Sequence, residues 1–383
     1  MLTNGISFIN YKTKVNSHKI NNKLRQILKE KNQVIKSLTL DYKNSFDKTL
    51  VKKYERFSNF RIIGLGGSIL GSQAIYQFLK SKIKKNFFFI DNLNPKINID
   101  KKKKFVNIVV SKSGKTIETV ANINVLLNKK DKNIFITENK INYLHQLAQT
   151  LKNEIIHHNN FIGGRYSVLS EVGMLPAELM NLKTSRFKQF NALIKNKKFI
   201  NNLVTNVSSI LDFQKKKKFN SVIINYDEKS EGLFKWYQQL VAESLGKDKK
   251  GILPIISNMP KDNHSVMQLY LDGFQNNFYT FFYVNEKKSE KIKNGLLFSQ
   301  NFLKDKNFSN ILFAQKKATE NIFKKKKIPF RSFEIKQRNE KTLGELFTFF
   351  ILETILIAKC LNLNPYNQPA VELIKNETKK ILL

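Results

Sequence analysis

Cysteine is nearly absent from this sequence, since Cys360 is the only one among 383 residues. A single cysteine excludes an intrachain disulfide and a cysteine-rich zinc site, so a reducing, intracellular setting is expected. Long apolar runs are also lacking, because the most apolar stretch, residues 346–361, is interrupted by Glu353 and Lys359. It is shorter than the roughly 20 residues that cross a bilayer, and it predicts a buried helix. The first residues hold no apolar stretch of signal-peptide length, so we expect a cytoplasmic protein without a membrane anchor.

Acidic residues are scarce, 30 against 67 basic ones, which gives a formal net charge of +37. Such a balance is typical of nucleic-acid binders. However, lysine is spread along the whole chain, with short runs at Lys101–Lys104, Lys215–Lys218 and Lys324–Lys327, and no RNP-type motif or zinc finger accompanies it. This pattern favours a composition bias with a solvated surface, so no specific nucleic-acid partner is predicted, and polyanion binding is kept as an alternative. The positive field is expected to attract small anionic substrates.

Short apolar runs alternate with helical spacing of apolar residues in two parts of the chain. The strand-like runs are Arg61–Leu65, Phe87–Ile90, Phe105–Val110, Asn133–Thr137 and Glu154–His157 in the first part, and Ser221–Asn225, Gly251–Ile256, Phe278–Val284 and Arg331–Ile335 in the second. Alternation of strand and helix predicts βαβ units, and therefore an α/β fold with two doubly wound parallel sheets and helical additions. The predicted parts are a helical segment over 1–55, an α/β subdomain over 56–165, a helical connection over 166–212, a second α/β subdomain over 213–362 and a C-terminal helix over 363–383.

Two turns join a predicted strand to a predicted helix and have the composition of a phosphate site. The first is Gly64–Ser68 (GLGGS), but Ile69 stands where the dinucleotide fingerprint needs its third glycine. The second is Ser111–Thr116 (SKSGKT), but Val109 stands where a P-loop needs a glycine. Three hydroxyls and two lysines at a helix start suit a compact phosphate monoester. The alternative is a capped helix with solvated lysines.

Three further side chains are candidates for proton transfer or charge stabilisation. Glu243 lies four residues after Gln239 near the end of a predicted helix, so the two share one face and Glu243 is a candidate base. His264 follows a loop and opens a predicted helix, and the five histidines show no metal-ligand spacing, so no metal is predicted. Arg165 follows two glycines and is suited to stabilise an oxyanion. Taken alone, Glu243 and His264 are more typical of surface or helix-capping positions, and the alternative for Arg165 is a surface ion pair.

Taken together, six motifs resemble those of the phosphoglucose isomerase (glucose-6-phosphate isomerase) family. They are Gly64–Ser68, Ser111–Thr119 (SKSGKTIET), Gly163–Pro176 (GGRYSVLSEVGMLP), Gln239–Lys247 (QLVAESLGK), Asn263–Gly273 (NHSVMQLYLDG) and Gln368–Lys375 (QPAVELIK). One such match is weak, but six in the family's order are specific. The sequence departs from the family pattern at Lys115, where threonine is usual, and at Asn367, where aspartate is common, and the chain is shorter than most relatives.

The resemblance implies two sugar-isomerase (SIS-like) subdomains and a homodimer that interconverts glucose-6-phosphate and fructose-6-phosphate without a cofactor, in glycolysis and gluconeogenesis. Glu243 would move the proton between C1 and C2 through an enediol(ate), which Arg165 would stabilise. His264, donated across the dimer interface, and Lys375 would help to open the sugar ring. The implied substrate- and phosphate-binding residues are Gly67, Ser68, Ser111, Lys112, Ser113, Thr116, Gln239 and Gln368. The alternatives are an enzyme that also isomerises mannose-6-phosphate and a noncatalytic sugar-phosphate-binding protein.

Overall fold

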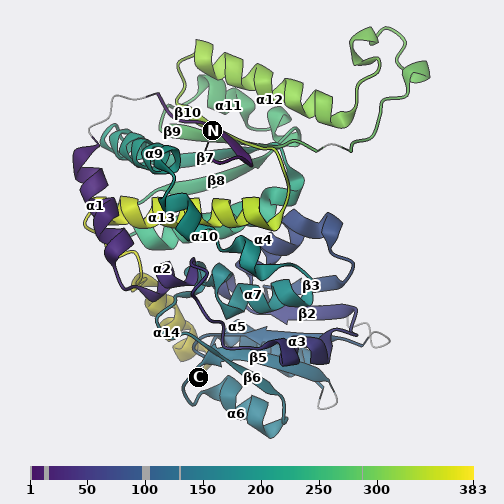
Figure 1. The fold of residues 1–383 in the computed structure, drawn as a ribbon, viewed down its shortest axis with the longest axis vertical. Coiled ribbons are helices and arrows are strands. Elements are labelled where there is room, and N and C mark those ends of the chain that lie inside the picture. Colours follow the sequence, from purple (N-terminus) through teal and green to yellow (C-terminus); the bar gives the residue numbers. More distant parts are fainter. Residues whose placement is uncertain (1, 13–16, 97–103, 129–130, 287) are drawn as a thin grey trace.

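In the computed structural model, which describes residues 2–12, 17–96, 104–128, 131–286 and 288–383, two five-stranded sheets are stacked with helices between and outside them (Figure 1). The helices of the N-terminal half are α1 (His18–Lys29), α2 (Gln33–Ser37), α3 (Lys48–Tyr54), α4 (Leu70–Leu79), α5 (Ile117–Leu126), α6 (Tyr143–Thr150) and α7 (Glu171–Leu179). Those of the C-terminal half are α8 (Phe190–Ile194), α9 (Lys197–Lys215), α10 (Glu231–Leu245), α11 (Met267–Asp272), α12 (Phe308–Lys325), α13 (Glu340–Cys360) and α14 (Ala370–Leu382).

The first sheet is parallel throughout and has the strand order β3-β2-β4-β5-β6. Its strands are β2 (Asn59–Ile63), β3 (Asn86–Ile90), β4 (Val106–Val110), β5 (Lys132–Glu138) and β6 (Glu154–His158). Strand order reverses between β2 and β4, and in such sheets ligands bind beyond the carboxyl ends of the strands at that reversal. Both predicted phosphate turns, Gly64–Ser68 and Ser111–Thr116, directly follow these two strands.

The second sheet has the order β1-β10-β9-β7-β8, and the four strands from its own subdomain are parallel. They are β7 (Asn220–Asn225), β8 (Leu253–Asn258), β9 (Asn277–Val284) and β10 (Phe330–Ile335). The prediction of two doubly wound parallel sheets is therefore confirmed. The helical prediction for residues 1–55 is incomplete, because β1 (Ile6–Ile9) pairs antiparallel with β10. Four residues carry too little alternation to identify a strand, and the partner edge lies more than 300 residues away in the sequence.

Except for its last residue, the apolar stretch 346–361 lies within α13, which is buried along most of its length, as predicted, and which lies between the two sheets (Figure 1). Its Glu353 forms a buried ion pair with Arg331 of β10. No helix in the described part of the chain is long and apolar enough to cross a membrane. The first three residues of the lysine run Lys101–Lys104 lie outside the described residues.

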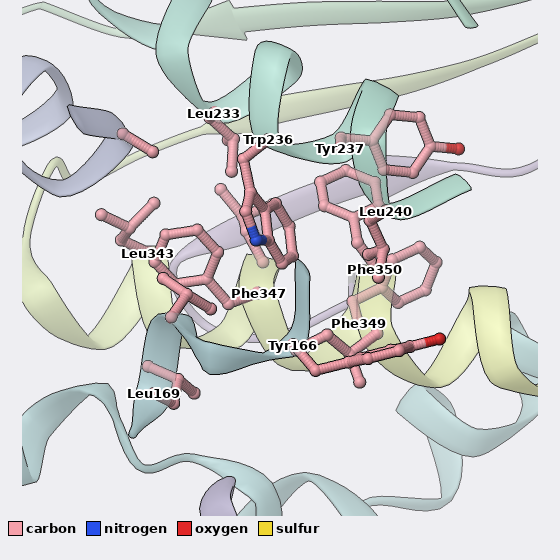
Figure 2. Close-up of a cluster of buried hydrophobic side chains, with 14 of the residues drawn as sticks. Tyr166, Leu169, Leu233, Trp236, Tyr237, Leu240, Leu343, Phe347, Phe349 and Phe350 are labelled. Atoms are coloured by element: carbon pink, nitrogen blue, oxygen red, sulfur yellow. The ribbon is translucent and has the colours of Figure 1, made fainter. Parts of the chain in front are cut away.

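The two subdomains share one apolar core in which α10 packs against α13 (Figure 2). The ring centroids of Trp236 and Phe347 lie 4.8 Å apart, and those of Tyr237 and Phe350 lie 4.6 Å apart. The indole Nε1 of Trp236 also donates a hydrogen bond of 3.1 Å to the backbone carbonyl of Arg165. The core therefore places the segment that carries Arg165 directly against α10.

We expect the Trp236→Ala substitution to lower the free energy of unfolding by about 3–5 kcal/mol, because it opens a large cavity in a close-packed core. Phe298→Ala is the control, because the Phe298 side chain is 89% exposed. Its cost is expected to stay within about 0.5 kcal/mol. Urea unfolding followed by circular dichroism measures both, and equal midpoints for the two variants would contradict the packing shown in Figure 2.

Candidate active site

The Gly64–Ser68 turn approaches two other parts of the chain so closely that its glycines leave no room for a Cβ atom. Gly66 has φ +53°, and a Cβ there would lie 2.7 Å from Nε2 of Gln239 on α10. A Cβ on Gly67 would lie 2.1 Å from the carbonyl carbon of Gly164 and 2.4 Å from the backbone nitrogen of Arg165. The backbone contact therefore requires glycine at Gly67, and the positive φ favours glycine at Gly66. The turn brings the end of β2 against α10 and against the segment that carries Arg165.

The Ser111–Thr116 loop lies at the end of β4 and leads into α5. The hydroxyls of Ser111 and Thr116 are 2.9 Å apart, and Thr116, the N-cap residue of α5, makes no side-chain capping bond. Lys112 Nζ donates a hydrogen bond of 2.6 Å to the carbonyl of Asn160, and burial lowers its pKa. Ser113 is exposed, and its hydroxyl accepts from the backbone N–H of Lys115 at 3.3 Å. Hydroxyls and a helix N-terminus thus lie at the carboxyl end of β4, the strand next to β2 and its Gly64–Ser68 turn.

Arg165 lies at the start of the 3-10 helix Gly164–Leu169, and its side chain is only 1% exposed. A guanidinium group has five N–H donors. Nε donates to Ser244 Oγ at 2.8 Å, and Nη2 donates to the carbonyls of Pro365 and Asn367 at 2.6 and 3.1 Å. Nη1 donates to Glu243 Oε2 at 3.1 Å and to Gln368 Oε1 at 2.6 Å. Five acceptors from two distant segments thus match the five donors of one buried cation.

Glu243 lies in the last turn of α10, and its carboxylate is held from two sides. Arg165 binds Oε2, while Gln239 Nε2 donates to Oε1 at 2.9 Å. The Glu243 side chain is 29% exposed, so a small molecule can reach it. The side-chain amide oxygen of Gln239, Oε1, is buried and has no hydrogen-bond partner within the part of the chain that the structure describes. A buried, unpaired acceptor beside an accessible carboxylate is suited to a hydroxyl of a bound ligand.

Lys247 belongs to this cluster, although no role was predicted for it. Its Nζ donates to the carbonyls of Ser244, Asn364 and Asn367 at 2.9, 2.7 and 2.8 Å. Burial, and secondly the charge of Arg165, lower the pKa of Lys247 to about 8. Its position just past a helix end was the available signal, because lysines there bind the last carbonyls. The backbone carbonyl of Asn367, not its side chain, makes these contacts, so asparagine in place of the family's usual aspartate preserves them.

His264 and Lys375 do not join the cluster. His264 ends the 3-10 helix Lys261–His264 after β8, and it is exposed. Lys375 Nζ pairs with Glu372 at 2.6 Å on α14, which has no buried residue. Within the described ranges, neither side chain makes a hydrogen bond or ion pair to Glu243 or Arg165. The exposed apolar side chains of α14 are Val371, Leu373, Ile374, Ile381 and Leu382.

The two turns, Arg165 and Glu243 lie within the part of the chain that matches a known family. The family model for phosphoglucose isomerase matches residues 16–253. The chain is 32% identical, over 362 residues, to a glucose-6-phosphate isomerase of Methanocaldococcus jannaschii, with 89% of this chain and 86% of that protein covered. The chain belongs to the phosphoglucose isomerase family.

Solved structures agree with the fold. A glucose-6-phosphate isomerase of Chlamydia trachomatis superposes with a TM-score of 0.76 at 18% identity, over 99% of this chain and 89% of that one. A tagatose-6-phosphate ketose/aldose isomerase of Escherichia coli superposes with a TM-score of 0.54 at 14% identity, over 93% and 97%. These likenesses confirm the predicted SIS-like α/β fold. Among the described residues, no group of three or more His, Cys, Asp or Glu side chains is arranged to hold a metal ion.

The turn geometry predicts different costs for two neighbouring glycine substitutions. Gly67→Ala forces the Gly164–Arg165 backbone away and is expected to cost about 1–3 kcal/mol or more. Gly163→Ala is the matched control, because its Cβ would meet only Cδ2 of Tyr166, at 3.9 Å, and its φ of −71° suits alanine. Its cost is expected to stay within about 0.5 kcal/mol. Urea unfolding tests both variants, and a Gly67→Ala variant as stable as Gly163→Ala would contradict the close approach.

Proposed function

We propose that this chain interconverts glucose-6-phosphate and fructose-6-phosphate in the cytoplasm, with Glu243 as the base that moves the proton between C1 and C2. The observation that carries the proposal is the Glu243–Arg165–Gln239–Gln368 cluster beside two hydroxyl- and glycine-rich turns. Membership of the phosphoglucose isomerase family supports it independently. An aldose–ketose isomerisation needs these groups, a carboxylate, a fixed cation and a phosphate site, and it needs no redox centre.

The phosphate is proposed to bind at the crevice between the ends of β2 and β4. Ser111 and Thr116 supply hydroxyls, and the first turn of α5 supplies backbone N–H groups and a positive dipole end. Ser68, Ser113, Lys112 and the backbone at Gly67 are proposed to complete this site. Since the phosphate lies away from the reacting carbons, its binding energy positions C1 and C2 against Glu243.

Proton transfer is proposed to occur on the face of the sugar turned to Glu243. One carboxylate can remove the proton from one carbon and return it to the next, because both carbons are presented on the same side. Arg165 places a permanent positive charge beside that carboxylate, where an enediolate oxygen would develop its charge. The unpaired acceptor of Gln239 and the amide of Gln368 are proposed to bind sugar hydroxyls.

Ring opening is proposed to require a second subunit. His264 and Lys375 are exposed and, within the described part of one chain, make no hydrogen bond or ion pair to Glu243, and the apolar side chains of α14 are exposed as well. In a homodimer, His264 of the partner subunit would act at the ring oxygen or the anomeric hydroxyl of the sugar. Association through apolar faces such as that of α14 would supply the driving force.

Replacing the proposed base tests the assignment directly. Glu243→Gln keeps the hydrogen-bonding shape but removes the basic charge, so kcat is expected to fall by about 10²–10⁴-fold with a much smaller change in KM. Glu231→Gln, at the other end of α10, is the matched control and is expected to keep wild-type activity. The assay couples glucose-6-phosphate formation from fructose-6-phosphate to a dehydrogenase, with a chelator present. An active Glu243→Gln variant would overturn the base assignment, and an inactive but folded wild type would overturn the function.

Mixed dimers test whether His264 acts across the interface. Heterodimers of Glu243→Gln and His264→Gln chains, purified through two tags, are expected to recover about half the wild-type activity, because one site receives both intact residues. A heterodimer of wild type and the Glu243→Gln/His264→Gln double variant is expected to be inactive, because neither site is then complete. The reverse pattern of activities would place both residues in one chain.

A further inference from the structure

A cavity of about 730 Å³ lies at the end of the second sheet where β9 and β10 begin. None of its lining residues belongs to the Glu243–Arg165 cluster or to the two phosphate turns. Its volume lies in the range typical of small-molecule sites. The cavity therefore needs an explanation separate from isomerisation.

The cavity brings together two lysine runs that are far apart in the sequence. Lys216 and Lys218 come from the run Lys215–Lys218, and Lys324, Lys326 and Lys327 come from the run Lys324–Lys327. Lys12 is the sixth lysine of the lining, and Asp272 is its only carboxylate. Six cations against one anion create a local potential that favours an anionic ligand.

Each lysine run lies at the C-terminal end of a helix, and the chain leaves both helices with the same backbone conformation. After α9, the Lys218 N–H bonds to the carbonyl of Phe213, and after α12, the Ile328 N–H bonds to the carbonyl of Phe323, each at 2.9 Å. The residue in the left-handed conformation is Lys217 in the first case, with φ +58°, and Lys327 in the second, with φ +55°. Glycine is the usual residue there. The dipole of each helix favours a cation at its C-terminal end. It does not explain why the two lysine runs line the same cavity.

The lysines of the lining are poorly neutralised by the protein. Lys326 lies 3.9 Å from Asp272, and Lys216 pairs with Asp212 at 2.8 Å. For the side-chain ammonium groups of Lys12, Lys324 and Lys327, the described part of the chain provides no hydrogen-bond or ion-pair partner. Burial, and secondly repulsion from Lys216, lower the pKa of Lys218, as expected for an ammonium group in a crowded positive site.

The floor of the cavity is aromatic. Its aromatic side chains are Phe213, Tyr270, Phe274, Tyr279 and Phe330. Phe274 is 54% exposed, whereas the other four are buried, so one aromatic face is open to a ligand. Aromatic rings stack on planar bases, and lysines bind phosphates as point charges.

We propose that this cavity is a second binding site of the protein, for a nucleoside polyphosphate. The base would stack on Phe274, and the phosphates would lie among Lys216, Lys324 and Lys327. A volume of about 730 Å³ is of the size that holds one small ligand, so we assign the cavity to a single nucleotide, and binding of a nucleic-acid strand is an outcome that the test separates. The proposal goes beyond the isomerase function and does not depend on it.

Calorimetric titration of the full chain with metal-free ATP tests the proposal, with saturating glucose-6-phosphate and fructose-6-phosphate present to occupy the catalytic site. One ATP per chain is expected, with an affinity that falls as salt is added. The cavity variant is Lys216→Gln/Lys324→Gln/Lys327→Gln. The control is Lys215→Gln/Lys217→Gln/Lys325→Gln, which removes the same charge from the same runs, but from lysines that do not line the cavity. Each triple variant changes one left-handed lysine, so folding costs are matched, and unaltered isomerase activity checks folding.

The cavity variant is expected to bind ATP at least about tenfold more weakly than wild type, while the control keeps wild-type affinity. Phe274→Leu is expected to weaken ATP binding about tenfold and to leave inorganic tripolyphosphate binding unchanged. Equal losses in the two triple variants, or no saturable ATP binding by wild type, would overturn the site. Tighter binding of a single-stranded oligonucleotide, lost equally in both triple variants, would assign the charge to a general polyanion surface and would also overturn it.

Discussion

The buried guanidinium of Arg165 is the interaction on which the arrangement of the site depends. A buried charge is tolerated only when its donors are satisfied, and here two segments distant from Arg165 in the sequence must converge to satisfy all five. The end of α10 supplies Glu243 and Ser244, and the segment before α14 supplies two carbonyls and Gln368. The same bonds therefore fix the carboxylate and the path of the chain toward Lys375. The indole N–H of Trp236 donates a hydrogen bond to the backbone carbonyl of Arg165. This bond connects the site to the core shared by both subdomains.

The second constraint is backbone proximity at the Gly64–Ser68 turn. Gly66 abuts the Gln239 side chain of α10 and Gly67 abuts the Gly164 backbone, so the end of β2 touches both α10 and the segment that carries Arg165. Because β4 is the neighbour of β2, the Ser111–Thr116 loop lies along the same edge. The doubly wound topology thus sets the Gly64–Ser68 turn against α10, the helix of the other subdomain that carries the Glu243 carboxylate. Neither subdomain alone contains this combination.

The sequence predicted most of this architecture, because the strands are short, apolar and bounded by turns. The strand-like runs of both subdomains correspond to β2–β10, and α13 lies where the apolar stretch indicated a buried helix. β1 was missed because its pairing with β10 is a long-range contact that local alternation cannot reveal. Lys247 had a local signal, a position past a helix end, but its targets Asn364 and Asn367 become neighbours only after folding.

His264 and Lys375 are the predicted catalytic residues that the described part of a single chain does not bond to Glu243 or Arg165. The groups proposed for proton transfer are fixed within the chain by hydrogen bonds to a saturated cation, whereas the groups proposed for ring opening stand on exposed segments. A long, flexible lysine on a helix without a buried residue gains little from its single pair with Glu372, since exposed ion pairs contribute at most about 1 kcal/mol. Such a side chain is held in a defined position only when its helix packs against another surface. Under the proposed function, Glu243 and Arg165 are preorganised by folding, and the ring-opening groups are preorganised by association.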